Sequence, residues 1–315
     1  MSTSAGTTAP LTDATIVLKD VSRWYGNVVA VNGMSFSVSP GITGLLGPNG
    51  AGKSTLLHML SGFLEPSAGE VTVLGAATWR DPELYRKVGL VPERESVYDS
   101  LTGYEFVLLN ARLQGTADPV AATQRSIREV DLEDAAQRST GGYSKGMKQR
   151  IKIAAALVHD PEILLLDEPF NGADPRQRLH MTELFRRLAA EGRTLVFSSH
   201  ILEEVERLAE RVLVIVGGRL AAAGDFREIR RLMTDRPHTF IVRTSNDRRL
   251  ASALVAHESV LGVELIDGRL TVRTSELSAF ARAVPSIARS TEVSIFELRA
   301  TDESLEDVFS YLVNG

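Results

Sequence analysis

Apolar and polar residues alternate along the chain between residues 14 and 39. The segments TIVLKDVSRWY and VVAVNGMSFSVSP have the period of two that is typical of half-buried strands, so two or three antiparallel strands are predicted there. GEVTVLG, from Gly69 to Gly75, predicts a hairpin of the same kind. Short runs of purely apolar residues predict buried strands further on, at GITGLLG, KVGLVP, EILLLDEP, TLVFSSH and VLVIVGGRL.

Helical periodicity appears between these apolar runs. KSTLLHMLSGFL places Leu56, Leu57, Leu60 and Phe63 on one side, residues 103 to 160 have mostly helical patterns, and ILEEVERLAERV predicts an amphipathic helix. Strands that alternate with helices indicate an α/β fold with a parallel sheet. Ligands of such sheets bind at the carboxyl ends of the strands, and here several strands end in polar residues.

The pattern changes after about residue 224. A basic segment, REIRRLM, leads to RPH and is interpreted as a linker. The predicted order that follows is strand, helix, strand, strand, helix, strand, which is the order of a ferredoxin-like α+β domain. A final helix, SLEDVFSYLV, is expected to close residues 225–315. No phosphate loop, metal cluster or nucleophile is evident in this part, so we interpret it as a regulatory or dimerisation domain.

Composition and charge exclude several classes of protein. The 315 residues fit one large domain or two ordinary ones, and the net charge of -5 argues against broad electrostatic binding of nucleic acid. Without any cysteine, neither a disulfide framework nor a thiolate metal site can form. Residues 1–13 are small and polar, which indicates a flexible tail. No apolar run has the length of a membrane span, so the chain is not expected to cross a bilayer by itself.

The glycine-rich turn between the third strand and its helix carries the first chemical motif. It fits G-x-x-x-x-G-K-[ST], a phosphate-binding P-loop, and consists of Gly47, Pro48, Asn49, Gly50, Ala51, Gly52, Lys53 and Ser54, with Thr55 next. Backbone N–H groups of such a loop surround phosphate oxygens, and the helix dipole favours the same anion. We expect Lys53 to reach the β- and γ-phosphates of ATP and Ser54 to hold Mg²⁺.

Two acids end the strand EILLLDEP. In a protein with a P-loop, Asp167 is expected to hold the Mg²⁺ and Glu168 to polarise the attacking water. The alternative is an N-cap pair of acids before Pro169, which would be the better interpretation without the P-loop.

The segment YSKGMKQR, residues 143–150, opens a helical stretch shortly before this acidic strand. Five motifs occur in a fixed order over residues 14 to about 224: a P-loop, YSKGM, LLLDEP, NGADP and SSH. Together they resemble the motifs of ATP-binding cassette (ABC) ATPases, the motor subunits of ABC transporters. The resemblance implies a P-loop NTPase cassette with a RecA-like parallel sheet, an antiparallel β subdomain and a helical subdomain at about 93–160. It also implies hydrolysis of ATP.

A head-to-tail dimer of cassettes follows from the same resemblance, as a homodimer or a heterodimer. Ser144 and Gly146 would then bind the γ-phosphate of a nucleotide held by the partner, and Asp174 would act across the interface. His200 would contact the γ-phosphate and hold the attacking water with Glu168. The alternative for His200 is a locally bonded histidine at a strand end.

Tyr25 resembles the adenine-stacking aromatic of the family, although Trp24 and Tyr25 could also be core and rim residues.

Three positions depart from the common family pattern. Glu93 stands where glutamine is usual, and its carboxylate could still reach Mg²⁺. Lys145 replaces the first glycine of the S-G-G signature, and Ala173 replaces a leucine of the D-loop. None of these changes removes a catalytic group, so hydrolysis is still expected.

The combination of a single cassette, YSKGM, Glu93 and a C-terminal segment ending in LEDVF resembles ABC-2 type exporters. The resemblance implies a separate integral membrane permease, with this chain at the cytoplasmic face of the membrane. The permease is expected to dock after Glu93, with Tyr98, Leu101, Tyr104 and Phe106 as candidate contacts, or else as ordinary core residues.

The main alternative to an exporter subunit is a soluble ABC ATPase that acts on ribosomes or DNA, and another is a P-loop kinase for a small molecule.

Overall fold

A computed structural model describes residues 14–94, 96–225, 238–266 and 269–300 of the chain. It divides into two compact units, Met1–Phe226 and Arg227–Gly315, and each is described here by itself. The expected tail, the linker and the last helix lie outside the described residues.

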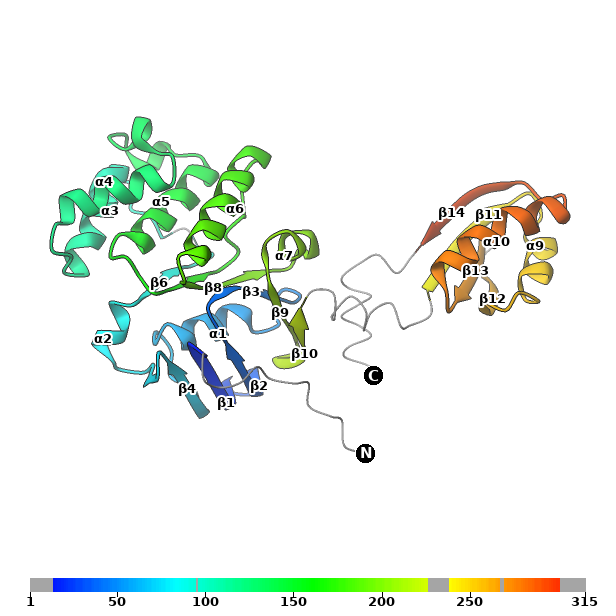
Figure 1. Ribbon diagram of the computed structural model, residues 1–315, viewed down its shortest axis with the longest axis horizontal. Helices are drawn as coiled ribbons and strands as arrows, with labels where there is room; N and C mark the ends of the chain where they lie inside the picture. The colour runs from blue at the N-terminus through cyan, green and yellow to red at the C-terminus, as the bar shows by residue number, and fades with distance from the viewer. Residues whose placement is uncertain (1–13, 95, 226–237, 267–268, 301–315) are drawn as a thin grey trace. The chain divides into compact units, whose positions relative to one another are not determined.

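A six-stranded sheet forms the centre of the first unit (Figure 1). Its strand order is β10-β9-β3-β8-β7-β6, with the bounds β3 Gly41–Leu46, β6 Val88–Val91, β7 Ile163–Leu166, β8 Thr194–Ser199, β9 Arg211–Val216 and β10 Arg219–Asp225. All neighbouring strands from β9 to β6 are parallel, and only β10 is antiparallel to its neighbour. This confirms the parallel sheet and the strand pair with a Gly-Gly turn.

A smaller antiparallel sheet in the order β2-β1-β4-β5 comes from the alternating segments of the sequence. Its strands are β1 Ile16–Tyr25, β2 Val28–Val38, β4 Ala68–Val73 and β5 Ala76–Ala77. One hydrophobic core includes Ile16 of this sheet, Leu56 of helix α1 (Lys53–Leu60) and Leu165 of β7. Both sheets therefore pack against α1 in one core, and this packing fixes the position of the turn before α1.

Helices cover the rest of the first unit, and α3, α4 and α5 lie together on the side away from β1 and β2 (Figure 1). The bounds are α2 Pro82–Tyr85, α3 Gly103–Leu113, α4 Pro119–Glu129, α5 Lys145–Leu157, α6 Pro175–Ala190 and α7 Leu202–Leu208, with short 3₁₀ turns at η2 Glu133–Ala135 and η3 Thr140–Gly142. Helix α6 was not predicted from the sequence. The amphipathic helix predicted over residues 201–212 is shorter in the structure, where α7 ends at Leu208 and Arg211 already begins β9.

The second unit has the strand order β12-β13-β11-β14, and each neighbouring pair is antiparallel. Its elements are β11 His238–Thr244, α9 Asp247–Leu254, β12 Val260–Ile266, β13 Arg269–Thr274, α10 Leu277–Ser290 and β14 Ile295–Ala300. This connectivity confirms the predicted ferredoxin-like arrangement. Phe240, Val272 and Phe280 are among the residues of its own hydrophobic core.

Among the residues that the structure describes, no helix is long and apolar enough to span a bilayer.

Candidate nucleotide site

The P-loop joins β3 to α1, as the sequence predicted. Gly52 is the N-cap of α1 at a φ of 103°, and a Cβ at this position would lie 2.3 Å from the carbonyl oxygen of Ala30. Only glycine fits such a place, because both the backbone conformation and the close approach exclude a side chain. The loop is also tied to strands behind it: Gly47 N–H donates to the Ser199 carbonyl, and Gly218 N–H donates to the Ala51 carbonyl.

Lys53 lies under this loop rather than in solvent. Its Nζ donates to the carbonyls of Gly47 and Pro48 at 2.7 and 3.2 Å and lies 3.7 Å from Oε1 of Glu168. Burial lowers the pKa of Lys53 from its usual range, while the carboxylates of Glu168, Asp167 and Glu93 act in the opposite direction. The ammonium is therefore desolvated and placed next to the loop that would hold an anion, where its attraction to a phosphate is stronger than in water.

The two acids after β7 are fixed by one hydroxyl of the neighbouring strand. Ser198 Oγ accepts from the Glu168 N–H at 2.9 Å and donates to Oδ1 of Asp167 at 2.6 Å. Asp167 and Glu168 are both buried, at 3% and 8% exposure. Glu168 has a φ of 49°, a left-handed conformation that is unusual for a residue other than glycine and that needs support from its surroundings. The hydrogen bond from its N–H to Ser198 supplies part of that support.

His200 follows β8 and reaches Glu168. Its Nδ1 lies 3.0 Å from both carboxylate oxygens of Glu168. Burial raises the pKa of Glu168, and the hydrogen bond and charge of His200, followed by the charge of Lys53, partly counteract this effect. The structure therefore brings Lys53, Asp167, Glu168 and His200 together at one edge of the parallel sheet, and the acid pair is more than a simple helix cap.

The signature and D-loop residues form a second cluster at the N-termini of α5 and α6. Ser144 caps α5 by accepting from the Met147 N–H, and Asp174 caps α6 in a reciprocal pair with Gln177. A Cβ on Gly146 would lie 2.1 Å from Oε1 of Gln177, so a side chain here would displace the amide of Gln177 from the cap of α6. Ser144 is exposed and stands at a helix N-terminus, which is a favourable place for an anion.

Lys145, one of the three departures, packs against Gly172 of the D-loop in this cluster. Gly172 has a φ of 73°, and a Cβ there would lie 2.8 Å from Cβ of Lys145. The stem of Lys145 therefore packs on the D-loop of its own chain.

Tyr25 is the last residue of β1, and the carboxylate of Glu93 raises the pKa of Lys53. Tyr25 and Trp24 are each 45% exposed, so exposure does not distinguish between them as a stacking surface. The guanidinium of Arg23 covers the ring of Tyr25 at 4.8 Å from the centroid. Glu93 is exposed, in the loop after β6.

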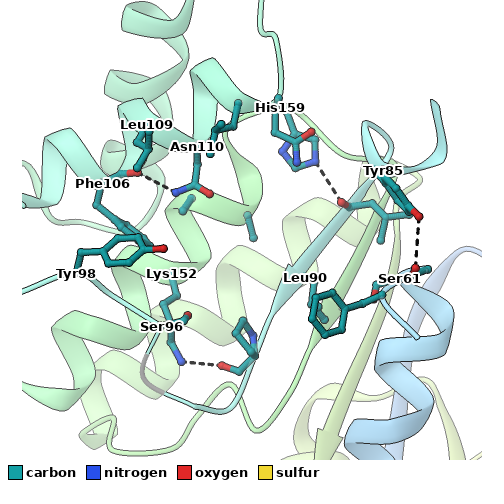
Figure 2. A pocket seen from close by; sticks show the side chains of 18 residues that line it. Ser61, Tyr85, Leu90, Ser96, Tyr98, Phe106, Leu109, Asn110, Lys152 and His159 are labelled. Carbon is teal, nitrogen blue, oxygen red and sulfur yellow. Dashed lines mark hydrogen bonds between the residues drawn. The ribbon is translucent and has the colours of Figure 1, made fainter. Parts of the chain in front are cut away.

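A groove of about 580 Å³ runs between the helices and the sheet (Figure 2). Of the four candidate docking residues, Tyr98 and Phe106 line this groove, and Leu101 and Tyr104 are not among its lining residues. Tyr98 is 62% exposed, whereas Phe106 is buried like an ordinary core residue. Phe63 and Leu113 also line it and are 74% and 76% exposed. Their exposure could not be predicted from the sequence, because both belong to helical patterns that also occur in cores.

Comparison with known proteins agrees with this geometry. The sequence profile of the ABC transporter family matches residues 31–171. The Nod factor export ATP-binding protein I of Rhizobium etli is 41% identical over 213 residues, which cover 66% of this chain and 67% of that protein. The linearmycin resistance ATP-binding protein LnrL of Bacillus subtilis is 31% identical over 297 residues, covering 92% of this chain and 96% of the relative.

Solved structures give the same result for the first unit. An ATP-binding subunit of an ABC transporter is 31% identical with a TM-score of 0.64, covering 70% of this chain and 93% of that one. A dimeric post-hydrolysis state of the cassette MJ0796, bound to ADP and Pi, is 25% identical with a TM-score of 0.63, covering 67% of this chain and 99% of that one. The chain belongs to the ABC transporter ATP-binding proteins, and it is an ATP-binding and ATP-hydrolysing cassette.

The donor set also suits Mg²⁺. Magnesium in nucleotide sites usually takes one or two protein ligands and completes its shell with phosphates and water. Ser54 is the second residue of α1, next to Lys53, and Asp167 directly follows β7. In the described part of the chain no group of three His, Cys, Asp or Glu side chains could hold a metal by itself. A hydroxyl and a carboxylate beside a phosphate loop are sufficient for Mg²⁺ that arrives with ATP.

Proposed function

We propose that this chain is the ATP-hydrolysing subunit of an ABC-2 type exporter and that it drives a separate membrane permease from the cytoplasmic face. The observation that carries the export assignment is the 41% identity to a Rhizobium protein that is named for Nod factor export. The similarity to the linearmycin resistance protein LnrL extends over 92% of this chain and so includes the second unit. The transported molecule is not part of the proposal.

Glu168 is proposed to act as the general base, because its carboxylate is desolvated and lies at the edge of the sheet next to the phosphate loop. His200 orients that carboxylate through Nδ1, which leaves Nε2 to face the γ-phosphate. Lys53 exchanges loop carbonyls for phosphate oxygens when nucleotide binds. Bound Mg²⁺ would supply charge neutralisation at the β- and γ-phosphates, held by Ser54, Asp167 and Glu93.

The cluster of Ser144, Gly146 and Asp174 is proposed to complete the nucleotide site of a partner cassette. A serine hydroxyl, bare backbone and a helix N-terminus form an anion site that lies on α5 rather than on the P-loop. Dimer formation would therefore depend on ATP. Tyr25 is proposed to contact the adenine at the rim.

The groove is proposed as the docking site of the permease. An exposed patch that contains Phe63, Tyr98 and Leu113 is costly in water, and burial of such side chains by an amphipathic helix would stabilise a complex. The groove is lined by α3 and α5 and by the loop after β6, so its occupant would contact the elements that carry Glu93 and Ser144.

The test uses Glu168→Gln in the full chain. This variant should bind ATP but not hydrolyse it, because only the water-polarising group is lost, and it should accumulate as an ATP-bound dimer. The tagged variant would be purified with ATP from membranes solubilised in mild detergent. Recovery of an integral membrane protein with several apolar spans supports the proposal. Recovery of ribosomes or DNA, or of no membrane protein, contradicts it, and turnover at the wild-type rate contradicts the role of Glu168.

A further inference from the structure

Lys152 is a buried lysine on α5, with 5% of its surface exposed. Its Nζ donates to three consecutive carbonyls in the loop after β6: Pro92 at 2.7 Å, Glu93 at 3.3 Å and Arg94 at 3.1 Å. Figure 2 shows the side chain reaching across one end of the groove to this loop. A buried ammonium is expensive unless its donors are satisfied, and three carbonyls satisfy all three N–H donors. The loop backbone is therefore folded around this side chain.

The same loop is anchored to the nucleotide edge on its other side. Asp167 N–H donates to the carbonyl of Val91 at 2.8 Å, directly before the residues that Lys152 holds. Glu93 lies between these two anchors, and its carboxylate raises the pKa of Lys53, against the larger effect of burial. Because α5 begins at Lys145, directly after its cap Ser144, one helix carries both Lys152 and the signature residue.

We propose that Lys152 is a positioning residue for Mg²⁺·ATP: by holding the backbone of residues 92–94, it directs the carboxylate of Glu93 toward the metal side of the nucleotide site. Lys152 does not contact substrate. It acts through the loop, in the way that outer-shell partners orient metal ligands. The inference rests on the ATPase cassette itself and not on the export assignment or on docking in the groove, so it can be tested without a permease.

The primary experiment measures ATP affinity by calorimetry, with Mg²⁺ and with EDTA, in the full chain carrying Glu168→Gln to prevent turnover. Lys152→Met has a similar length and no donors. It should reduce the gain in affinity that Mg²⁺ provides by about tenfold, the usual size of an outer-shell effect. The affinity in EDTA should not change, because the P-loop is untouched. An equal loss with and without Mg²⁺, or no loss at all, overturns the proposal.

Two comparisons separate positioning from a general loss of structure. Lys148→Met removes another lysine from the same helix, one that pairs with Asp99, and should leave the Mg²⁺ effect intact. In a double-mutant cycle, Lys152→Met should add no further loss once Glu93→Ala is present, since Lys152 acts through Glu93. Full additivity of the two losses contradicts the proposal.

The absence of cysteine from the sequence allows a chemical rescue if Lys152→Met folds poorly. Lys152→Cys would introduce a single thiol, which can be alkylated in denaturant and refolded. Aminoethylation restores an ammonium at nearly the length of lysine, whereas ethylation gives a neutral thioether. We expect only the aminoethylated protein to recover the Mg²⁺ effect. Equal behaviour of the two refolded proteins, or failure of both to refold while alkylation-treated wild type refolds, overturns the positioning role.

Discussion

The carboxylate of Glu168 is buried between Lys53 and His200, and these surroundings set the pH range in which it can act as a base. Burial raises its pKa, so its active, ionised form is lost at a higher pH than for a free carboxyl group. His200 lowers the pKa of Glu168, so His200→Ala should raise it further. We expect the acidic limb of the residual kcat–pH profile to move to higher pH in this variant.

The matched comparison for this prediction is His180→Ala on α6. His180 lies near the carbonyl of Glu129 and not in the site, so its loss should leave the acidic limb in place. An unshifted limb in His200→Ala would mean that a group other than Glu168 controls the profile.

The chemically distinctive residues could be predicted from sequence, and their supports could not. Lys53, Asp167, Glu168 and His200 each occur in a short motif whose residue types have a direct chemical reason. Lys152 lies in no motif, and the type of Ser198 does not reveal its role within SSH, because a serine in TLVFSSH and a lysine in KQRIKIAAAL are ordinary residues until tertiary contacts place them. Their roles depend on partners about 30 and 60 residues away.

At the scale of elements, the site depends on the hydrogen bonds of Ser198, which connect the end of β8 to the two acids after β7. Ser198→Ala should leave the N–H of Glu168 buried without a partner, at a cost of about 1–3 kcal/mol in stability. The acids would also lose their alignment, and kcat should fall by about tenfold to a hundredfold. Urea unfolding and steady-state ATPase assays measure the two effects.

Thr194→Val provides the comparison on the same strand. Thr194 is as buried as Ser198, and its hydroxyl pairs with Thr15 at the opposite end of β8. This variant should lose stability but keep kcat. If Ser198→Ala lost stability with an unchanged kcat, the hydroxyl would be structural and would not align the acids.

Most elements followed from the sequence because their periodicity is strong and their ends carry clear signals. The helix α6 was missed although Asp174 and Pro175 are typical of a helix start. Its interior has few apolar positions, including Met181, Leu184, Phe185 and Leu188 among many arginines, so the apolar stripe is narrow. The order of the strands within each sheet could be predicted only in part, because periodicity identifies strands but not their neighbours.

For the whole molecule, the groove and the nucleotide site are expected to be separable. Tyr98→Glu and Leu113→Glu add charge to exposed positions of the groove, far from the P-loop in sequence and outside the contacts of Lys53 and Glu168. Both variants should keep the ATPase activity of the isolated chain and lose co-purification with the permease. Retained co-purification in both would place docking elsewhere on the surface.

The position of β3 also has a consequence for how the chain is made. This apolar strand, which leads into the P-loop, pairs with β8 and β9, and β8 begins about 150 residues later. At about 5–20 residues per second, a ribosome needs roughly 7–30 s to supply the first of these neighbours. During that interval β3 has two open edges, which is the condition under which strands associate with the wrong chain. Synthesis of this protein should therefore depend on protection of its N-terminal quarter while the rest is being translated.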